Sequence, residues 1–312
     1  MHGRHFEFQK GFQNVRLPNL VHFAFTDTNR ELQEVGVVAL AKACPHLRYL
    51  NLSGVAKLDN YLLQKILQGS KHINYISLLR NNKITNDVFN ILRSDIQVME
   101  GLELGGKPTE FQHNISLDGI ENLCETHRSI KYIKFEYCSK IGSETIMKLA
   151  TTLHDSLRHL SIIRNFNEKS ARIDDEATEA LATCCPNLEH LEIVYSRKFD
   201  ERICRNLGNG NLLRLQVLDL SYCPIQCSME PLIKGCPDLF ELKLAGDSFI
   251  RKLVLLSIAK LPELKIFHLG HFDHSDVECK KVIPQDPVFK SYSTKGIVVA
   301  KTFEDPANYP KL

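Results

Sequence analysis

The stretch Cys44-Pro-His-Leu-Arg-Tyr-Leu-Asn-Leu-Ser53 places three leucines at the spacing L-x-x-L-x-L, directly after a Cys-Pro pair. The same arrangement recurs at Cys185-Pro-Asn-Leu-Glu-His-Leu-Glu-Ile193 and at Cys236-Pro-Asp-Leu-Phe-Glu-Leu-Lys-Leu244. Ten copies of the core follow one another, and their leading apolar residues are Leu20, Leu47, Ile73, Met99, Ile130, Leu157, Leu188, Leu215, Leu239 and Leu264. Successive copies start 24 to 31 residues apart, so one unit is repeated along most of the chain.

A period in the mid-twenties with this core is the sequence signature of leucine-rich repeats. The alternation in Leu50-Asn51-Leu52 predicts a short strand that points its leucines inward and Asn51 outward. Helical spacing follows each strand, for example over residues 61–68, and the Cys-Pro pairs mark helix ends because proline cannot continue a helix. We therefore predict an α/β leucine-rich-repeat solenoid, a horseshoe of about ten repeats with parallel strands on the concave face and helices on the convex face.

The repeats divide the 312 residues into three predicted segments. Residues 1–16 are expected to form an N-terminal lead that caps the first repeat, residues 17–275 the solenoid, and residues 276–312 a C-terminal cap and tail. Within that tail, Ile297-Val-Val-Ala300 is expected to add one strand. Two repeats are longer than the others, and their extra residues, 105–114 and 164–170, are predicted to emerge as loops on one rim.

Charge and hydropathy restrict the partners and the compartment. The 39 basic and 37 acidic residues give a net charge of +2, so no general basic field is expected to attract nucleic acid or an anionic membrane. The first ten residues carry no apolar signal-peptide stretch, and a near-continuous apolar run such as residues 253–259 is far too short to span a bilayer. We expect a cytoplasmic protein, with the nucleus as the alternative compartment, and neither a membrane nor a nucleic-acid partner.

The cysteines follow the repeat rather than a disulfide pattern. Cys44, Cys185 and Cys236 precede a proline, whereas Cys138 and Cys223 lie three residues beyond the last core position. Residues tied in this way to one repeat position are expected to be buried thiols that fill small apolar spaces. Such thiols are typical of a reducing compartment.

The form C-P-x-L-x-x-L-x-L-x-x-C resembles the cysteine-containing leucine-rich repeats of F-box/leucine-rich-repeat proteins. The resemblance covers most of the chain. It implies a curved α/β solenoid whose concave face and tail hold the target of an SCF-type (cullin-RING) ubiquitin ligase, and hence a role in ubiquitin-dependent protein degradation. The residues before Leu17 do not carry the helical F-box pattern, so a ligase adaptor is an expected partner only if an F-box lies upstream. The alternative is a leucine-rich-repeat scaffold or regulatory interaction protein without a ligase.

Strand alternation also predicts which side chains line the concave face. The position before the second core residue reads His22, Tyr49, Tyr75, Gly101, Tyr132, His159, His190, Val217, Glu241 and Ile266. The position two residues later is mixed in charge and reads Ala24, Asn51, Ser77, Glu103, Lys134, Ser161, Glu192, Asp219, Lys243 and His268. Rings with polar tips beside mixed charges suit a protein partner. The predicted partner-binding residues are Tyr49, Tyr75, Tyr132, His159, His190, Glu103, Lys134 and Glu192; the alternative is that the rings only stack on one another along the sheet.

Catalytic and metal-binding patterns are weak in this chain. His268, His271 and His274, with Asp276 and Cys279, offer zinc ligands, but their spacing matches no closed zinc motif, so ordinary loop histidines are the favoured interpretation. Cys184-Cys185 and Cys223-Pro-Ile-Gln-Cys227 are interpreted as packing residues rather than redox pairs. Asp174-Asp175-Glu176 is expected to open a helix. We therefore predict no enzyme activity, no metal and no cofactor.

Overall fold

Each described copy of the L-x-x-L-x-L core folds as a strand of three to five residues. The computed structural model describes residues 15–26, 34–110, 114–164, 171–196, 198–199, 202–225, 227–245, 257–258, 260–269 and 298–301. The chain divides into two units, Met1–Lys140 and Ile141–Leu312, and each is described by itself.

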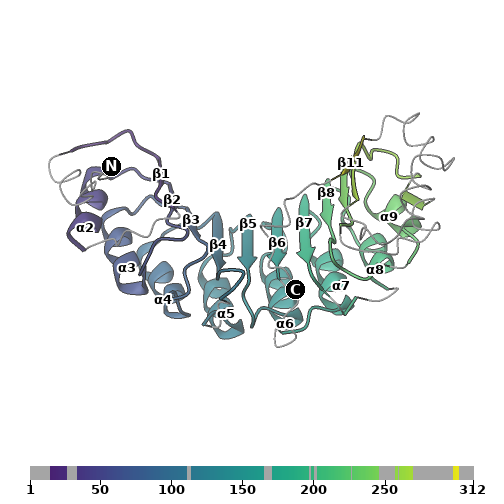
Figure 1. Cartoon of the computed structure of the whole chain (residues 1–312), viewed down its shortest axis with the longest axis horizontal. Coiled ribbons are helices and arrows are strands. Elements are labelled where there is room, and N and C mark those ends of the chain that lie inside the picture. Colours follow the sequence, from purple (N-terminus) through teal and green to yellow (C-terminus); the bar gives the residue numbers. More distant parts are fainter. Residues whose placement is uncertain are drawn as a thin grey trace, which may run out of the picture. The chain divides into compact units, whose positions relative to one another are not determined.

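Unit 1 contains five parallel strands in chain order. They are β1 (His22–Ala24), β2 (Tyr49–Asn51), β3 (Tyr75–Leu78), β4 (Gly101–Gly105) and β5 (Tyr132–Glu136). The helices that follow the first four strands are α2 (Glu34–Ala43), α3 (Asn60–Gly69), α4 (Asp87–Asp95) and α5 (Leu117–Thr126). Helices α3 to α5 lie along one face of the strands (Figure 1). The opposite face carries no helix of this unit among the described residues, and we call it the open face.

Unit 2 repeats the plan. Its strands are β6 (His159–Ile163), β7 (His190–Val194), β8 (Val217–Asp219), β9 (Glu241–Lys243), β10 (Ile266–Leu269) and β11 (Val298–Lys301). All neighbours pair in parallel from β6 through β11. The helices are α6 (Ser143–Thr152), α7 (Asp175–Cys184), α8 (Ile203–Asn209) and α9 (Glu230–Gly235). Strand β11 confirms the extra strand predicted in the tail, shifted by one residue.

The repeated leucines form the core because period-two alternation sends them all to the helix side of the sheet. Leu47, Leu50 and Leu52 are fully buried, and so are Leu188 and the other core residues of its repeat. The parallel strands, the helix after each strand and this shared core confirm the predicted α/β leucine-rich-repeat solenoid.

A doubled hydrogen bond sets the register between neighbouring strands. The carbonyl of the residue just before a strand accepts the backbone N–H groups of two consecutive residues in the next repeat. Arg48 O, for example, accepts from Asn74 N at 2.9 Å and from Tyr75 N at 3.1 Å. Because the same contact recurs in both units, a one-residue slip of any strand would break it and turn the leucines away from the core.

The turn after several strands contains a left-handed residue two positions past the last core residue. These residues are Gly54 (φ 68°), Arg80 (φ 61°), Tyr137 (φ 52°), Tyr195 (φ 65°) and Tyr222 (φ 57°). The positive φ is uncommon for a residue with a Cβ atom. In unit 2 the rings of Tyr195 and Tyr222 stack with centroids 4.1 Å apart, which gives these side chains a contact that glycine would lack.

The polar side chains that precede α5 and α7 form hydrogen bonds with the neighbouring repeat instead of capping their own helix. Asp174 directly precedes α7, as predicted, and Ser116 directly precedes α5, but neither side chain caps its own helix. The Ser116 hydroxyl accepts from Asn86 Nδ2 at 2.7 Å, and Ser143 donates to Asp174 at 2.7 Å. Asp175 is buried and lies 3.6 Å from Arg202, so this part of the acidic cluster belongs to the packing between repeats.

Candidate protein-binding face

Aromatic and histidine rings stack along the open face of unit 1. His22, Tyr49, Tyr75, Gly101 and Tyr132 occupy one register column, as predicted. The ring centroids of His22 and Tyr49 are 5.2 Å apart, and those of Tyr49 and Tyr75 are 4.7 Å apart. The stacking named as the alternative is therefore present, and it leaves the three tyrosines half-buried with part of each ring accessible.

Gly101 allows the ring column to continue across β4. The centroids of Tyr75 and Tyr132 are 5.4 Å apart although a whole strand separates the two residues. A Cβ atom on Gly101 would lie 2.2 Å from Tyr75 Cδ2, so the Tyr75 ring occupies the space that a side chain would need. The missing side chain thus brings two tyrosines together on the open face.

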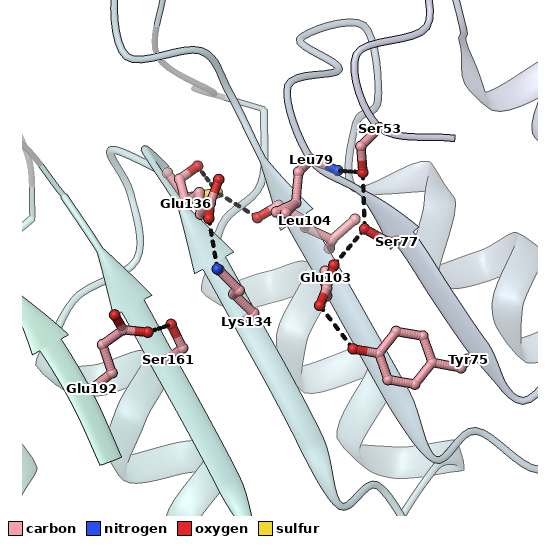
Figure 2. A network of polar contacts seen from close by, with 11 residues as sticks. Ser53, Tyr75, Ser77, Leu79, Glu103, Leu104, Lys134, Glu136, Ser161 and Glu192 are labelled. Carbon is pink, nitrogen blue, oxygen red and sulfur yellow. Dashed lines mark hydrogen bonds and ion pairs between the residues drawn. The ribbon is translucent and has the colours of Figure 1, made fainter. Parts of the chain in front are cut away.

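Glu103 is the centre of a polar network beside this column (Figure 2). Its Oε1 accepts from Tyr75 Oη at 2.7 Å, and its Oε2 accepts from Ser77 Oγ. The Ser77 hydroxyl also contacts Ser53 Oγ at 2.9 Å, and Ser53 Oγ accepts from the backbone N–H of Leu79 at 3.2 Å. Burial, followed by the hydrogen bond to Glu103, raises the pKa of Tyr75, so its hydroxyl stays protonated and holds the carboxylate in place.

Lys134 lies next to Glu103 in the register of the second column. Its Nζ is 2.7 Å from Glu136 Oε1 on the same strand, and both side chains are half-buried (Figure 2). Unit 1 therefore presents tyrosine rings, an oriented carboxylate and a lysine–glutamate pair on one face.

In unit 2 helices α6 to α8 also lie along one face of the strands, and we call the opposite face the open face of that unit (Figure 1). Two histidines begin it. His159 and His190 are paired in register, and their rings stack at 3.9 Å with an interplanar angle of 19°. Beside them Ser161 Oγ donates to Glu192 Oε2, which fixes that carboxylate much as Ser77 fixes Glu103 in unit 1 (Figure 2). Both units thus use a buried serine to orient a half-buried glutamate on the neighbouring strand.

Opposite charges alternate further along unit 2. Asp219 is buried, accepts from Ser221 N at 2.9 Å and lies 4.0 Å from Lys243 Nζ. Burial raises the pKa of Asp219 to about 6. Glu241 contacts Lys243 Nζ at 3.4 Å and His268 Nε2 at 2.8 Å. These contacts leave a polar surface of mixed sign, in contrast to the rings of unit 1.

All eight predicted binding residues lie in the two predicted columns and are half-buried. Five belong to unit 1 and three, His159, His190 and Glu192, to unit 2. Their role in binding stays a prediction. The sequence reasoning missed Ser77 and Ser161 as the residues that orient the carboxylates; a small hydroxyl residue one strand before a glutamate in the same column was the available signal.

The long repeats only partly follow the prediction. Gly105 belongs to β4, and the turn after it is closed by a short antiparallel bridge between Lys107 and Glu110. The Arg164 side chain is buried and its Nη2 donates to the Ala171 carbonyl, so Arg164 ties its loop down rather than lining the rim. Residues 111–113 and 165–170 lie outside the described residues.

The cysteines tied to the repeat are buried and free. Cys138, Cys185, Cys223 and Cys236 each donate a weak hydrogen bond to a carbonyl about one repeat earlier in the chain, at sulfur–oxygen distances of 3.2–3.9 Å. Burial raises the pKa of Cys185, Cys223 and Cys236 to about 12, so these thiols stay protonated. They act as small core residues, as predicted.

The metal alternative is tested only in part. Among the residues with a described placement, no group of three or more His, Cys, Asp or Glu side chains is placed to hold a metal ion. His271, His274, Asp276 and Cys279 lie outside that part of the chain, as do residues 1–14 of the predicted lead and residues 302–312 at the chain end. No helix in the described ranges is long and apolar enough to cross a bilayer.

The strand register, the helix after each strand and the shared leucine core together define a leucine-rich-repeat protein. Comparison with known sequences gives a partial match to a curated protein. The chain is 28% identical over 112 residues to the F-box protein FBW2 of Arabidopsis thaliana, which covers 34% of this chain and 32% of that protein. The match therefore spans about a third of the curated relative. No protein-family profile matches the chain.

Solved structures give broader but more distant similarities. A chain of the yeast Rad7 and Elc1 complex is 15% identical, with a TM-score of 0.49 and coverage of 90% of this chain and 80% of that one. An internalin (InlF) of Listeria monocytogenes is 16% identical, with a TM-score of 0.44 and coverage of 95% and 88%. The TLR13–ssRNA13 complex is also 16% identical, with a TM-score of 0.42 and coverage of 85% and 41%.

Proposed function

We propose that this chain is a protein-recognition module that binds a polypeptide on its open face and has no catalytic activity of its own. The observation that carries the proposal is the ring column of unit 1, in which Tyr75 contacts both Tyr49 and Tyr132 and all three tyrosines stay half-buried. Tyrosine contributes a large rigid surface with a polar tip, at little cost in side-chain entropy. The neighbouring Glu103 is held in place before any partner arrives, which reduces the ordering cost of binding.

The charge pattern supports a protein rather than a nucleic acid as partner. Glu103, Lys134 and Glu136 alternate in sign within unit 1, and acidic and basic residues alternate again along unit 2. Phosphate backbones call for clustered lysine and arginine side chains, which these columns lack. His159, His190 and Glu192 form the corresponding contact region of unit 2 in this proposal.

The experiment replaces the ring column and leaves the core intact. Proteins captured from a cell extract by the purified chain are identified, and the capture is repeated with the double variant Tyr75→Ala/Tyr132→Ala. Tyr61→Ala is the matched control, because Tyr61 is an exposed tyrosine on helix α3, away from the open face. We expect the double variant to lose one specific partner by tenfold or more in affinity, a loss of about 1.4 kcal/mol or more, while the control retains it.

Circular dichroism and thermal melting establish that the variants are folded before capture is compared. Equal capture by the folded double variant and by the wild-type chain would contradict binding at the ring column. His159→Ala/His190→Ala, measured separately, tests the proposed contribution of unit 2.

Within this function, we propose substrate recognition for an SCF-type ubiquitin ligase in the cytoplasm or nucleus. The cysteine-containing form of the repeat and the partial similarity to an F-box protein support this finer role. The competing proposal is a scaffold or regulatory interaction protein without a ligase.

The test of the ligase role uses the longest product of the gene. If that product contains an F-box before the repeats, it should bring down a cullin and its adaptor, and deletion of the F-box should abolish this association while leaving partner capture unchanged. A gene product without an F-box, or one that fails to bring down the adaptor, favours the scaffold.

A further inference from the structure

Two cysteines outside the repeated positions face each other in unit 2. Cys204 lies in helix α8, and Cys227 lies between β8 and α9, 23 positions later in the chain. Their Sγ atoms are 2.7 Å apart, compared with about 2.05 Å in a disulfide bond. Both are free thiols in this structure.

The surroundings of the two thiols differ in a way that matters for reactivity. Cys204 is fully buried and its sulfur contacts Met229 Sδ at 3.4 Å, whereas Cys227 is half-buried and accessible. The repeat-tied cysteines, such as Cys185 and Cys223, instead point their sulfurs at backbone carbonyls. The pair is therefore distinct from the packing cysteines described above.

We propose that Cys204 and Cys227 form a reversible thiol–disulfide site in which Cys227 reacts first with a small disulfide oxidant such as oxidised glutathione and Cys204 completes the exchange. The Cys227 thiolate attacks one sulfur of the oxidant R–S–S–R, forms a mixed disulfide and releases R–S⁻. Cys204 then loses its proton and attacks the Cys227 sulfur, which forms the Cys204–Cys227 disulfide and releases the second R–S⁻. The two released thiolates take up the two protons, so two cysteine thiols and one R–S–S–R become one protein disulfide and two R–SH.

The electrostatics of the pair support this order. The pKa of the Cys227 thiol is lowered, first of all by the hydrogen bond between its sulfur and that of Cys204. The same hydrogen bond and then burial raise the pKa of Cys204, so the buried sulfur keeps its proton until the mixed disulfide forms next to it. An accessible thiolate beside a protected thiol is the arrangement expected of a reacting and a resolving cysteine.

The disulfide would join one repeat to the next on the helix-bearing side of unit 2. Closing a loop of this length restricts the unfolded chain, and we expect the melting temperature to rise by on the order of 10 °C on oxidation. Because neither cysteine belongs to the open face, the site is independent of the proposed partner binding.

The experiment incubates the folded, reduced full chain with glutathione buffers of increasing oxidising strength, followed by acid quenching, alkylation and mass mapping of peptides. We expect a product that has lost two hydrogen atoms, a linked peptide containing Cys204 and Cys227, and full reversal by dithiothreitol. In Cys204→Ser the product should change to a stable glutathione adduct on Cys227, because the resolving thiol is gone. Cys184, which is also a half-buried free thiol, is the internal control and should react more slowly than Cys227.

The peptide masses of the oxidised wild-type chain test the proposal even if a variant fails to fold. A mixed disulfide that persists on wild-type Cys227, equal reactivity of Cys184 and Cys227, or a linked peptide that appears only in urea would each overturn it. Partner capture measured on the same oxidised and reduced samples is a separate readout, so a failure of the redox site and a failure of open-face binding are distinguishable.

Discussion

Replacing Gly101 by alanine should destabilise unit 1 through a single side chain, Tyr75. The new Cβ would lie 2.2 Å from Tyr75 Cδ2 and 2.3 Å from Tyr75 Cε2, whereas ordinary contacts begin at 3.4 Å. The ring must therefore move by at least 1.2 Å, the difference between 3.4 and 2.2 Å. A shift of this size breaks the 2.7 Å hydrogen bond from Tyr75 Oη to Glu103 and disturbs the stack on Tyr49 and Tyr132.

The expected cost follows from these contacts. A hydrogen bond to a half-exposed carboxylate contributes about 1–2 kcal/mol, and the ring contacts add about 0.5–1 kcal/mol. Alanine restricts the unfolded chain more than glycine does, which returns about 0.4–1 kcal/mol. The free energy of unfolding should therefore fall by about 1–2 kcal/mol.

Urea unfolding followed by circular dichroism and tyrosine fluorescence measures this change, because the chain contains no tryptophan to mask the tyrosine signal. The decisive comparison is the same substitution in a Tyr75→Ala background. All three nearest atoms to the new Cβ belong to Tyr75, so in that background Gly101→Ala should be neutral or slightly stabilising. Gly105→Ala is the control, because its Cβ would meet the Glu136 carbonyl oxygen at 2.5 Å and should destabilise both backgrounds. An equal cost of Gly101→Ala in both backgrounds would refute the reasoning.

Three further predictions concern the core and its buried polar groups. Burial raises the pKa of Asp219 from 3.8 to about 6, so the protonated form favours folding: its contribution is full below pH 4 and is lost as the pH rises through 6. This loss lowers the wild-type free energy of unfolding by on the order of 3 kcal/mol between pH 4 and pH 7. In Asp219→Asn the loss should be absent, so the unfolding midpoint of the variant should depend less on pH over this range than that of the wild type. Leu191→Ala should cost about 2–5 kcal/mol in urea unfolding because Leu191 is fully buried, whereas Leu213→Ala, at a residue 54% exposed, should stay within about 0.5 kcal/mol. Cys236→Ser should lower the melting temperature more than Cys236→Ala, because a hydroxyl placed 3.9 Å from the Leu207 carbonyl lacks a hydrogen bond inside the core; equal melting temperatures would contradict this.

The sequence was sufficient to predict the strands and their register because both depend on local rules. Alternation places Leu50 and Leu52 on one face of their strand, and the common phase of the repeats sets Tyr49 beside Tyr75. The buried repeat-tied cysteines follow from the same phase. A tail strand was also predictable from its short β-branched run, and β11 confirms it.

The remaining features depend on contacts that the repeat pattern does not specify. The Glu103 network requires Tyr75 to bend over Gly101, which is decided by the absence of one side chain on the intervening strand. Cys204 and Cys227 occupy different positions in their repeats, so no shared phase indicates that they meet. Arg164 was predicted to lie in a loop on the rim. Its side chain is buried instead, because its guanidinium donates a hydrogen bond to the Ala171 carbonyl.

The left-handed turns after the strands have a consequence for how such repeats diverge. Gly54 meets the torsional requirement of this turn without strain, whereas Tyr195 and Tyr222 hold an unfavourable torsion, worth about 1 kcal/mol each, and contribute a stacked pair of rings. Glycine and tyrosine have almost nothing else in common, yet both occupy this one position within a single chain. Substitution records at such a site should therefore favour residues that avoid the torsional cost, as glycine does, or that offset it through the contacts of a large side chain, as the stacked tyrosines do; Arg80 shows that the position also accepts a large residue other than tyrosine.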